Sequence, residues 1–168
     1  MAYVPFLFLF GSIFIFIYAA LKDFLTWKIS NVTVLAATTS YIPFAVTGLL
    51  AGPALSAKVD PINALAAAVM LFAIGFVLWT IRMLGAGDAK LMFPVGLFAG
   101  WDYMLPFVLG LMFFAVIALL AMKLPLPAGL GNMAVGMRLD EIRRSGKVPY
   151  GVVMVAALLA TLYVKYSA

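Results

Sequence analysis

Two carboxylates, each beside a long apolar run, are the residues of this sequence best suited to chemistry. Asp88 lies in the segment Leu-Gly-Ala-Gly-Asp-Ala-Lys, between two such runs. A charged side chain near the bilayer is costly, so an acid in this setting marks a candidate site. Gly85 and Gly87 would let a substrate backbone come close, or let two helices pack tightly. Lys90 would hold the anion or the loop, or orient the chain in the membrane.

Asp23, the second carboxylate, follows the first apolar run. Alone, Asp23 also fits a solvated helix end, and Asp88 alone also fits an N-cap that accepts backbone N–H groups. Together they can form an aspartyl dyad, in which an ionised acid takes a proton from water and a protonated acid polarises a carbonyl. We therefore predict that Asp23 and Asp88 hydrolyse a peptide bond at the membrane boundary.

The sequence contains no Cys and no His. This absence excludes disulfides, thiolate nucleophiles, imidazole bases and the metal sites that thiolates or imidazoles build. Acid–base chemistry therefore depends on carboxylates, Lys or Tyr, and we expect neither a cofactor nor a metal ion.

The composition is that of an integral membrane protein. Of the 168 residues, 67% are hydrophobic and 10% are charged, whereas soluble domains are about half apolar and a quarter charged. Since about 20 apolar residues span a bilayer as a helix, the length allows five or six spans. We predict an all-α, polytopic fold in which residues 1–168 form a single membrane-embedded domain. The net charge of +5 lies in short loops, which favours membrane lipids and not nucleic acid as the surroundings.

The apolar stretches predict about six transmembrane helices. Asp60 is expected to cap the third helix, with Pro61 in its first turn. Between spans five and six, Val135, Leu139 and Ile142 recur at helical spacing, which predicts an amphipathic helix in the membrane interface. The expected spans are residues 3–21, taken as retained and not as a cleaved signal peptide, 31–50, 61–81, a short or tilted helix from near Asp88, a helix from a turn at 100–103 to Met122, and 150–166.

The basic residues predict the orientation. Six spans would place Lys58 and Lys165 on one side and the other nine basic residues on the opposite side. The positive-inside bias makes the second side cytoplasmic and both termini external. Asp23 and Asp88 then fall on the cytoplasmic side, independently of any assumption about chemistry. The nine residues are Lys22, Lys28, Arg82, Lys90, Lys123, Arg138, Arg143, Arg144 and Lys147.

Three segments carry a resemblance to a known family. Residues 85–90, Gly-Ala-Gly-Asp-Ala-Lys, resemble the Gly-x-Gly-Asp-x-Lys motif of the type IV prepilin peptidases, which are membrane aspartyl proteases. Residues 23–31 resemble the segment with the family's first aspartate, with Ser30 where Pro is usual. Val-Pro-Tyr-Gly at 148–151 resembles the family's Pro-Tyr-Gly. The likeness covers nearly the whole chain in the same order.

The resemblance implies a substrate and a location. The substrate would be a prepilin with a basic leader and an apolar N-terminal helix, cleaved after the leader-terminal Gly at the cytoplasmic face of the bacterial inner membrane. Larger members carry an extra domain with CxxC motifs and also methylate the new N-terminus. This chain has no Cys, so it resembles the short form of tight-adherence (Flp-type) pili, and N-methyltransferase activity is not expected.

The division of labour within the dyad is predicted from the helix ends. Asp88 near a helix N-terminus would lean towards the anionic base, and Asp23 near a C-terminus towards the protonated partner. Two other functions stay open. A proton-coupled transporter would place its acids near the bilayer midplane and often repeats its half-chain. A non-catalytic pilus-assembly membrane protein would tolerate Asp→Asn at either site.

Overall fold

The computed structural model describes residues 3–56, 58–123, 134–145 and 148–167; of residues 54, 134–137, 139 and 145 it describes the backbone only. Every regular element in these ranges is a helix. In chain order they are α1 (Val4–Thr26), α2 (Asn31–Leu50), α3 (Pro53–Ser56), α4 (Pro61–Thr80), α5 (Ala86–Ala99), the 3₁₀-helix η1 (Trp101–Tyr103), α6 (Met104–Lys123), α7 (Ala134–Ser145) and α8 (Tyr150–Ser167).

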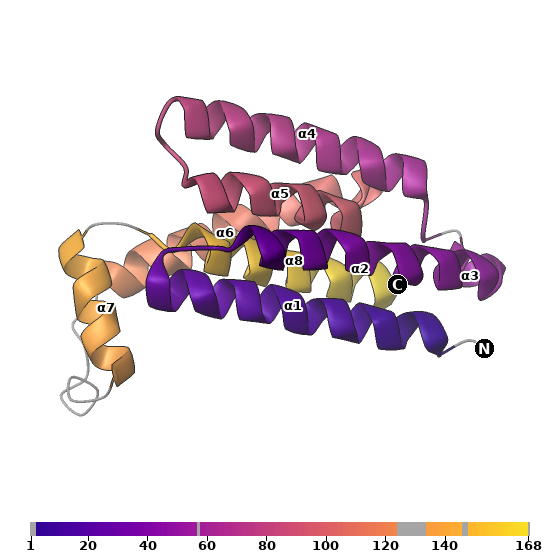
Figure 1. Cartoon of the computed structure of the whole chain (residues 1–168), viewed down its shortest axis with the longest axis horizontal. Coiled ribbons are helices and arrows are strands. Elements are labelled where there is room, and N and C mark those ends of the chain that lie inside the picture. Colours follow the sequence, from indigo (N-terminus) through magenta and orange to yellow (C-terminus); the bar gives the residue numbers. More distant parts are fainter. Residues whose placement is uncertain (1–2, 57, 124–133, 146–147, 168) are drawn as a thin grey trace.

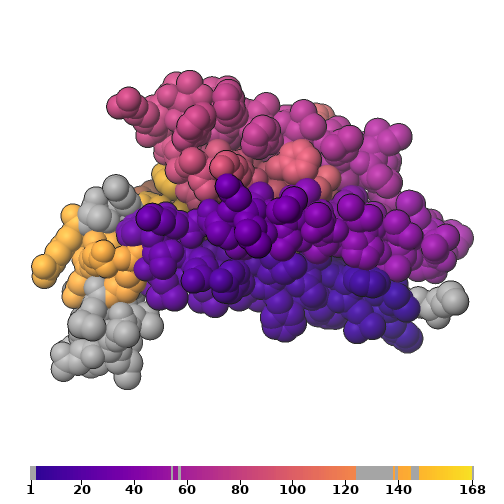
Figure 2. All heavy atoms as spheres, viewed as in Figure 1, coloured from indigo at the N-terminus to yellow at the C-terminus, as the bar shows by residue number. Residues whose placement is uncertain are grey.

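The long helices run side by side along the longest axis of the molecule (Figure 1). The short α3 lies near both chain ends at one end of the bundle, and α7 lies across the opposite end. In the space-filling view (Figure 2), the side chains of α1 and α2 form one continuous surface. Large apolar side chains cover the outside, for example Leu7, Phe14 and Val32, each more than two-thirds exposed. Such an exposed apolar surface is typical of a membrane-embedded bundle.

Among the residues that the structure describes, five helices are long and apolar enough to cross a membrane, which fits the predicted integral membrane protein built from helices. They are α1, α2, α4, α8 and the continuous segment of η1 and α6, Trp101–Lys123. The predicted short fourth span corresponds to α5, which has 14 residues and is not among these five. At 1.5 Å per residue α5 is about 21 Å long, whereas the hydrocarbon core is about 30 Å thick.

The short fourth helix, the turn and the following helix are confirmed. Helix α5 begins two residues before Asp88 and ends at Ala99, and the next residue, Gly100, has a φ of +76° that suits glycine. The cap at Asp60 is also confirmed, because its Oδ1 accepts from the backbone N–H groups of Ile62 and Asn63 at 2.9 and 3.2 Å. Pro61 opens α4 as expected.

Helix α5 lies in the interior because small residues let α4 approach it. A Cβ built on Gly96 would lie 2.5 Å from Ala68 Cα, and one built on Gly75 would lie 3.2 Å from Ala89 Cα. Small residues of this kind let the backbones of membrane helices come into close contact. On the other side, the ring of Phe98 lies with its centroid 5.4 Å from that of Phe16 and 5.6 Å from that of Phe44. These contacts fix α5, which carries Asp88.

One sequence-based boundary was wrong. The first helix does not end before Asp23 but continues to Thr26, where Trp27 takes the left-handed conformation (φ 56°) and donates its N–H to the Asp23 carbonyl. Lys165 lies within α8, as the predicted span 150–166 has it. Its side chain is 5% exposed, and Nζ donates to the carbonyls of Phe98 and Ala99 at 3.2 Å each. Lys165 therefore satisfies the C-terminal carbonyls of α5, an arrangement that sequence spacing does not reveal.

The predicted helix between spans five and six is present as α7, and its place in a membrane interface stays a prediction. Ile142 is buried, whereas the side chains of Val135 and Leu139 lie outside the described part of the chain. Two arginines connect α7 to the bundle: Arg138 Nε donates to the Phe24 carbonyl at 2.7 Å, and Arg143 donates to the Ala121 carbonyl at 2.8 Å.

Candidate active site

Asp23 and Asp88 line the same cavity, although they are far apart in the sequence. The cavity has a volume of about 490 Å³, and its lining residues come from around the end of α1 and the starts of α5 and α8. These helix ends lie at the end of the bundle next to α7 (Figure 1). The lining residues of the cavity are Asp23, Trp27, Arg82, Met83, Leu84, Gly85, Asp88, Val148 and Tyr150.

Asp23 is positioned by the last turn of α1 and the first turn of α8. Its side chain is 4% exposed, and Oδ2 accepts a hydrogen bond from the Gly151 backbone N–H at 2.9 Å. This N–H is one of the first amides of α8, which have no partner within their own helix. A Cβ on Gly151 would lie 2.8 Å from Oδ2, so glycine is required for this contact. Asp23 is therefore a buried carboxylate and not a solvated helix end.

Asp88 lies in the first turn of α5 and is 9% exposed. The N-cap of this helix is Gly85, so the alternative that Asp88 is the N-cap was wrong. Asp88 Oδ1 is buried and has no hydrogen-bond partner among the described residues. Burial, followed by the charge of Asp23, raises the pKa of Asp88 to about 7. Asp88 therefore carries a proton at a pH where an exposed aspartate would be ionised.

The supporting residues of the glycine segment have different surroundings. Gly85 lines the cavity, and a Cβ there would lie 2.9 Å from Asp88 Oδ2. Gly87 instead packs on the turn between α1 and α2, where a built Cβ would lie 3.1 Å from Ile29 Cβ. Lys90 Nζ donates to the side-chain oxygen of Asn31 at 2.9 Å, which ties α5 to the start of α2. Among the described residues, Lys90 thus contacts α2 and makes no hydrogen bond to either carboxylate.

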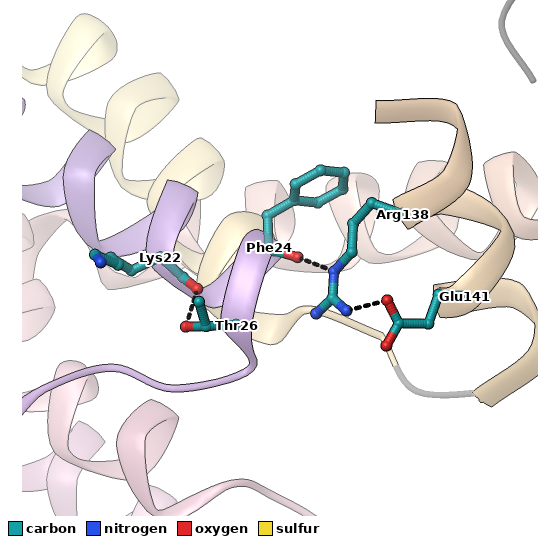
Figure 3. A network of polar contacts seen from close by, with 5 residues as sticks. All are labelled: Lys22, Phe24, Thr26, Arg138 and Glu141. Carbon is teal, nitrogen blue, oxygen red and sulfur yellow. Dashed lines mark hydrogen bonds and ion pairs between the residues drawn. The ribbon is translucent and has the colours of Figure 1, made fainter. Parts of the chain in front are cut away.

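Arg138 is a neighbour of the site that the sequence did not reveal as one. Its side chain reaches from α7 to the end of α1 and also pairs with Glu141 (Figure 3). The guanidinium lies over the ring of Trp27, 5.0 Å from the centroid, and Trp27 lines the cavity. Arg138 and its acceptor, the Phe24 carbonyl, are 114 positions apart, so periodicity and spacing carry no signal for the contact.

The Gly151 contact was missed for the same reason, although the Pro-Tyr-Gly resemblance pointed to its segment. Among the described residues, no three His, Cys, Asp or Glu side chains come together as metal ligands would. Chemically, the arrangement offers a hydrogen-bonded carboxylate and a buried carboxyl group of raised pKa in one cavity.

Comparison with known proteins gives one match. The model of the type IV leader peptidase family matches residues 6–120. The matched segment contains both aspartates and the glycine segment, whereas Arg138 and Gly151 lie beyond it. The comparisons with curated proteins and with solved structures gave no significant match.

Proposed function

This chain belongs to the type IV leader peptidase family, and on that premise we propose that it is a prepilin leader peptidase of the aspartic type. It hydrolyses the bond after the leader-terminal Gly of type IV or Flp-type prepilins at the cytoplasmic face of the bacterial inner membrane. Asp23 and Asp88 are its catalytic residues. One observation carries this assignment: two buried carboxylates from distant helices line one cavity at the end of an apolar bundle.

The surroundings of the two acids support a division of labour opposite to the one expected from the helix ends. The N–H of Gly151 favours the ionised form of Asp23, because a hydrogen-bond donor stabilises a carboxylate. Asp88 Oδ1 has no donor among the described residues, and burial raises the pKa of Asp88 to about 7. Asp23 is therefore the general base, and Asp88 is the general acid.

The reaction then follows the general route of paired carboxylates. Asp23 takes a proton from water while the water oxygen bonds to the scissile carbonyl carbon. Asp88 gives its proton to the carbonyl oxygen, which yields a neutral tetrahedral diol. Asp23 next gives its proton to the amide nitrogen, the C–N bond breaks, and one hydroxyl returns a proton to Asp88. Both acids end in their starting protonation states.

Other residues of the glycine segment support the dyad without taking part in the reaction. Gly85 leaves space beside Asp88, and Gly87 and Lys90 hold the start of α5 against the α1–α2 turn and α2. The expected substrate is a prepilin with a basic leader and an apolar N-terminal helix, and membrane lipids surround the bundle. The cytoplasmic location of the site is supported by the basic residues near it, among them Arg82 and Arg138.

The two alternatives have less support. A transporter places its acids near the bilayer midplane, whereas Asp23 lies in the last turn of α1 and Asp88 in the first turn of α5. A non-catalytic assembly protein needs no buried carboxyl pair.

The test is cleavage of a model prepilin by the protein reconstituted in lipid. Asp23→Asn and Asp88→Asn each abolish cleavage, because an amide is neither a base nor an acid of the required strength. Asp102→Asn, an exposed aspartate at the opposite end of the bundle, is the matched control and keeps full activity. Undiminished cleavage by either site variant would contradict the proposal.

A further inference from the structure

A second, apolar groove adjoins the cavity that holds the two carboxylates. It has a volume of about 210 Å³, and Leu84 and Tyr150 line both the groove and the cavity. All its lining side chains are apolar except for the Tyr150 hydroxyl. The other lining residues are Leu78, Met92, Leu111, Met112, Ala115, Val153 and Met154.

The groove arises from the way the helices pair. Helix α4 packs chiefly on α5, and α6 packs chiefly on α8. Gly110 brings α6 close to α8, with a built Cβ 3.5 Å from Ala157 Cα. A furrow is therefore left between α4 and α6. Met92 and Met154 are buried at its base, and Met112 on α6 is 63% exposed at its rim.

A rival groove lies between α1 and α8 and is larger, at about 280 Å³, with Ile17, Leu21 and Val155 among its lining residues. It shares no lining residue with the carboxylate cavity. Of these two grooves, the one between α4 and α6 shares lining residues with the carboxylate cavity and continues directly from it.

The continuity of a polar cavity with an apolar groove favours one kind of occupant. A peptide whose scissile bond lies in the cavity and whose next segment is apolar would fill both spaces with a single chain. A lipid acyl chain would fill the groove alone and would not explain why the groove continues into the polar cavity. Methionine side chains adapt to differently shaped partners, and three of them line the groove. Its volume suits side chains that project from a helix and not a whole helix.

We propose, as an extension of the proposed function, that the apolar segment of the peptide substrate docks along the groove between α4 and α6. Its side chains insert beside Met92, Met112 and Met154, while the scissile bond reaches Asp23 and Asp88. The substrate would thus enter the groove sideways, from the surrounding lipid.

Disulfide cross-linking tests this docking, because the chain has no Cys of its own. Met112→Cys places a thiol at the rim of the groove. Phe113→Cys is the matched control, since Phe113 is the next residue of α6, is 62% exposed and does not line the groove. Leu21→Cys reports on the rival groove. Each variant is made in the full-length Asp88→Asn protein, so that the substrate is not cleaved, and is oxidised with prepilins carrying single cysteines along the apolar segment.

The expected result is a cross-link to Met112→Cys that is lost in Phe113→Cys. Equal linking of both residues would indicate contact by lateral diffusion and would overturn the proposal. Linking to Leu21→Cys alone would move the docking to α1 and α8. If prepilin still co-purifies but links to none of the three cysteines, the substrate does not occupy the groove, and the proposal is also overturned.

Cleavage measurements separate this proposal from the proposed function. Ala115→Trp fills the groove away from the carboxylates. It should reduce cleavage of the full prepilin several-fold through KM and leave unchanged the cleavage of a short peptide that ends soon after the scissile bond. Equal loss with both substrates would contradict docking in the groove. If the wild-type protein cleaves neither substrate, the peptidase assignment itself fails.

Discussion

Gly151 acts on Asp23 through the absence of a side chain. Its N–H donates to Oδ2 of Asp23, and the space that a Cβ would need is occupied by the same carboxylate. Gly151→Ala should therefore displace the carboxylate and lower kcat/KM by about 10²-fold, the effect of a misplacement of roughly 1 Å. The measurement is cleavage of the model prepilin in lipid.

Gly11→Ala is the control for this substitution. Gly11 lies in the same helix as Asp23, and a Cβ there meets nothing within 4 Å. The control should keep the wild-type rate, and a Gly151→Ala protein that is as active as Gly11→Ala would show that the contact is dispensable.

The protonation of Asp88 predicts the pH dependence. Burial, and then the charge of Asp23, raises the pKa of Asp88 to about 7. A carboxyl group is protonated below its pKa, so the acid form is present below about pH 7 and is lost as the pH rises through that value. Log kcat/KM should therefore fall above about pH 7 with a slope near −1. A rate that rises between pH 7 and pH 9 would contradict Asp88 as the general acid.

At this scale the sequence predicted the two acids but not what surrounds them. Asp23 and Asp88 could be found because a carboxylate beside an apolar run is costly and rare. The donor to Asp23 comes from a residue 128 positions away and is a backbone N–H, which every residue except proline has. The proton on Asp88 depends on burial, which is a property of the folded chain.

Helix α5 packs closely on α4 at Gly96. Gly96→Ala would place a Cβ 2.5 Å from Ala68 Cα, and backbone cannot yield as a side chain can. We expect a loss of about 1–3 kcal/mol in stability, typical of an overpacked interior, seen as a lower temperature of thermal unfolding in detergent. Gly110→Ala is the control, since its Cβ would meet Ala157 at an ordinary 3.5 Å. Equal unfolding temperatures would show that α4 and α5 can separate at low cost.

Most of the helices could be predicted from the apolar runs and from the helix-breaking residues between them. The turn after α5 was predicted from Trp-Asp-Tyr within an apolar stretch that is too long for one span, and the structure has Gly100 and η1 there. The end of α1 was not predicted correctly, because charged residues can lie within a helix when their side chains find partners. Lys22 lies over the ring of Tyr18, and Asp23 binds Gly151.

In the molecule as a whole, the bundle brings helix ends together, and the site is built from those ends. The end of α1, the start of α5 and the start of α8 meet at the cavity, and α7 lies across the same end (Figure 1). An all-helical membrane bundle could be predicted from composition and length. The pairing of the helices could not be predicted in this way, because in lipid it depends on the fit of small residues such as Gly75 and Gly96.

The most direct test of the account is the cleavage rate of a reconstituted prepilin by Asp23→Asn, Asp88→Asn and the double variant, each compared at equal thermal stability. If the two carboxyl groups act as one unit, each single variant loses as much activity as the double variant. Independent, additive losses, or full activity with either acid removed, would contradict a shared catalytic dyad.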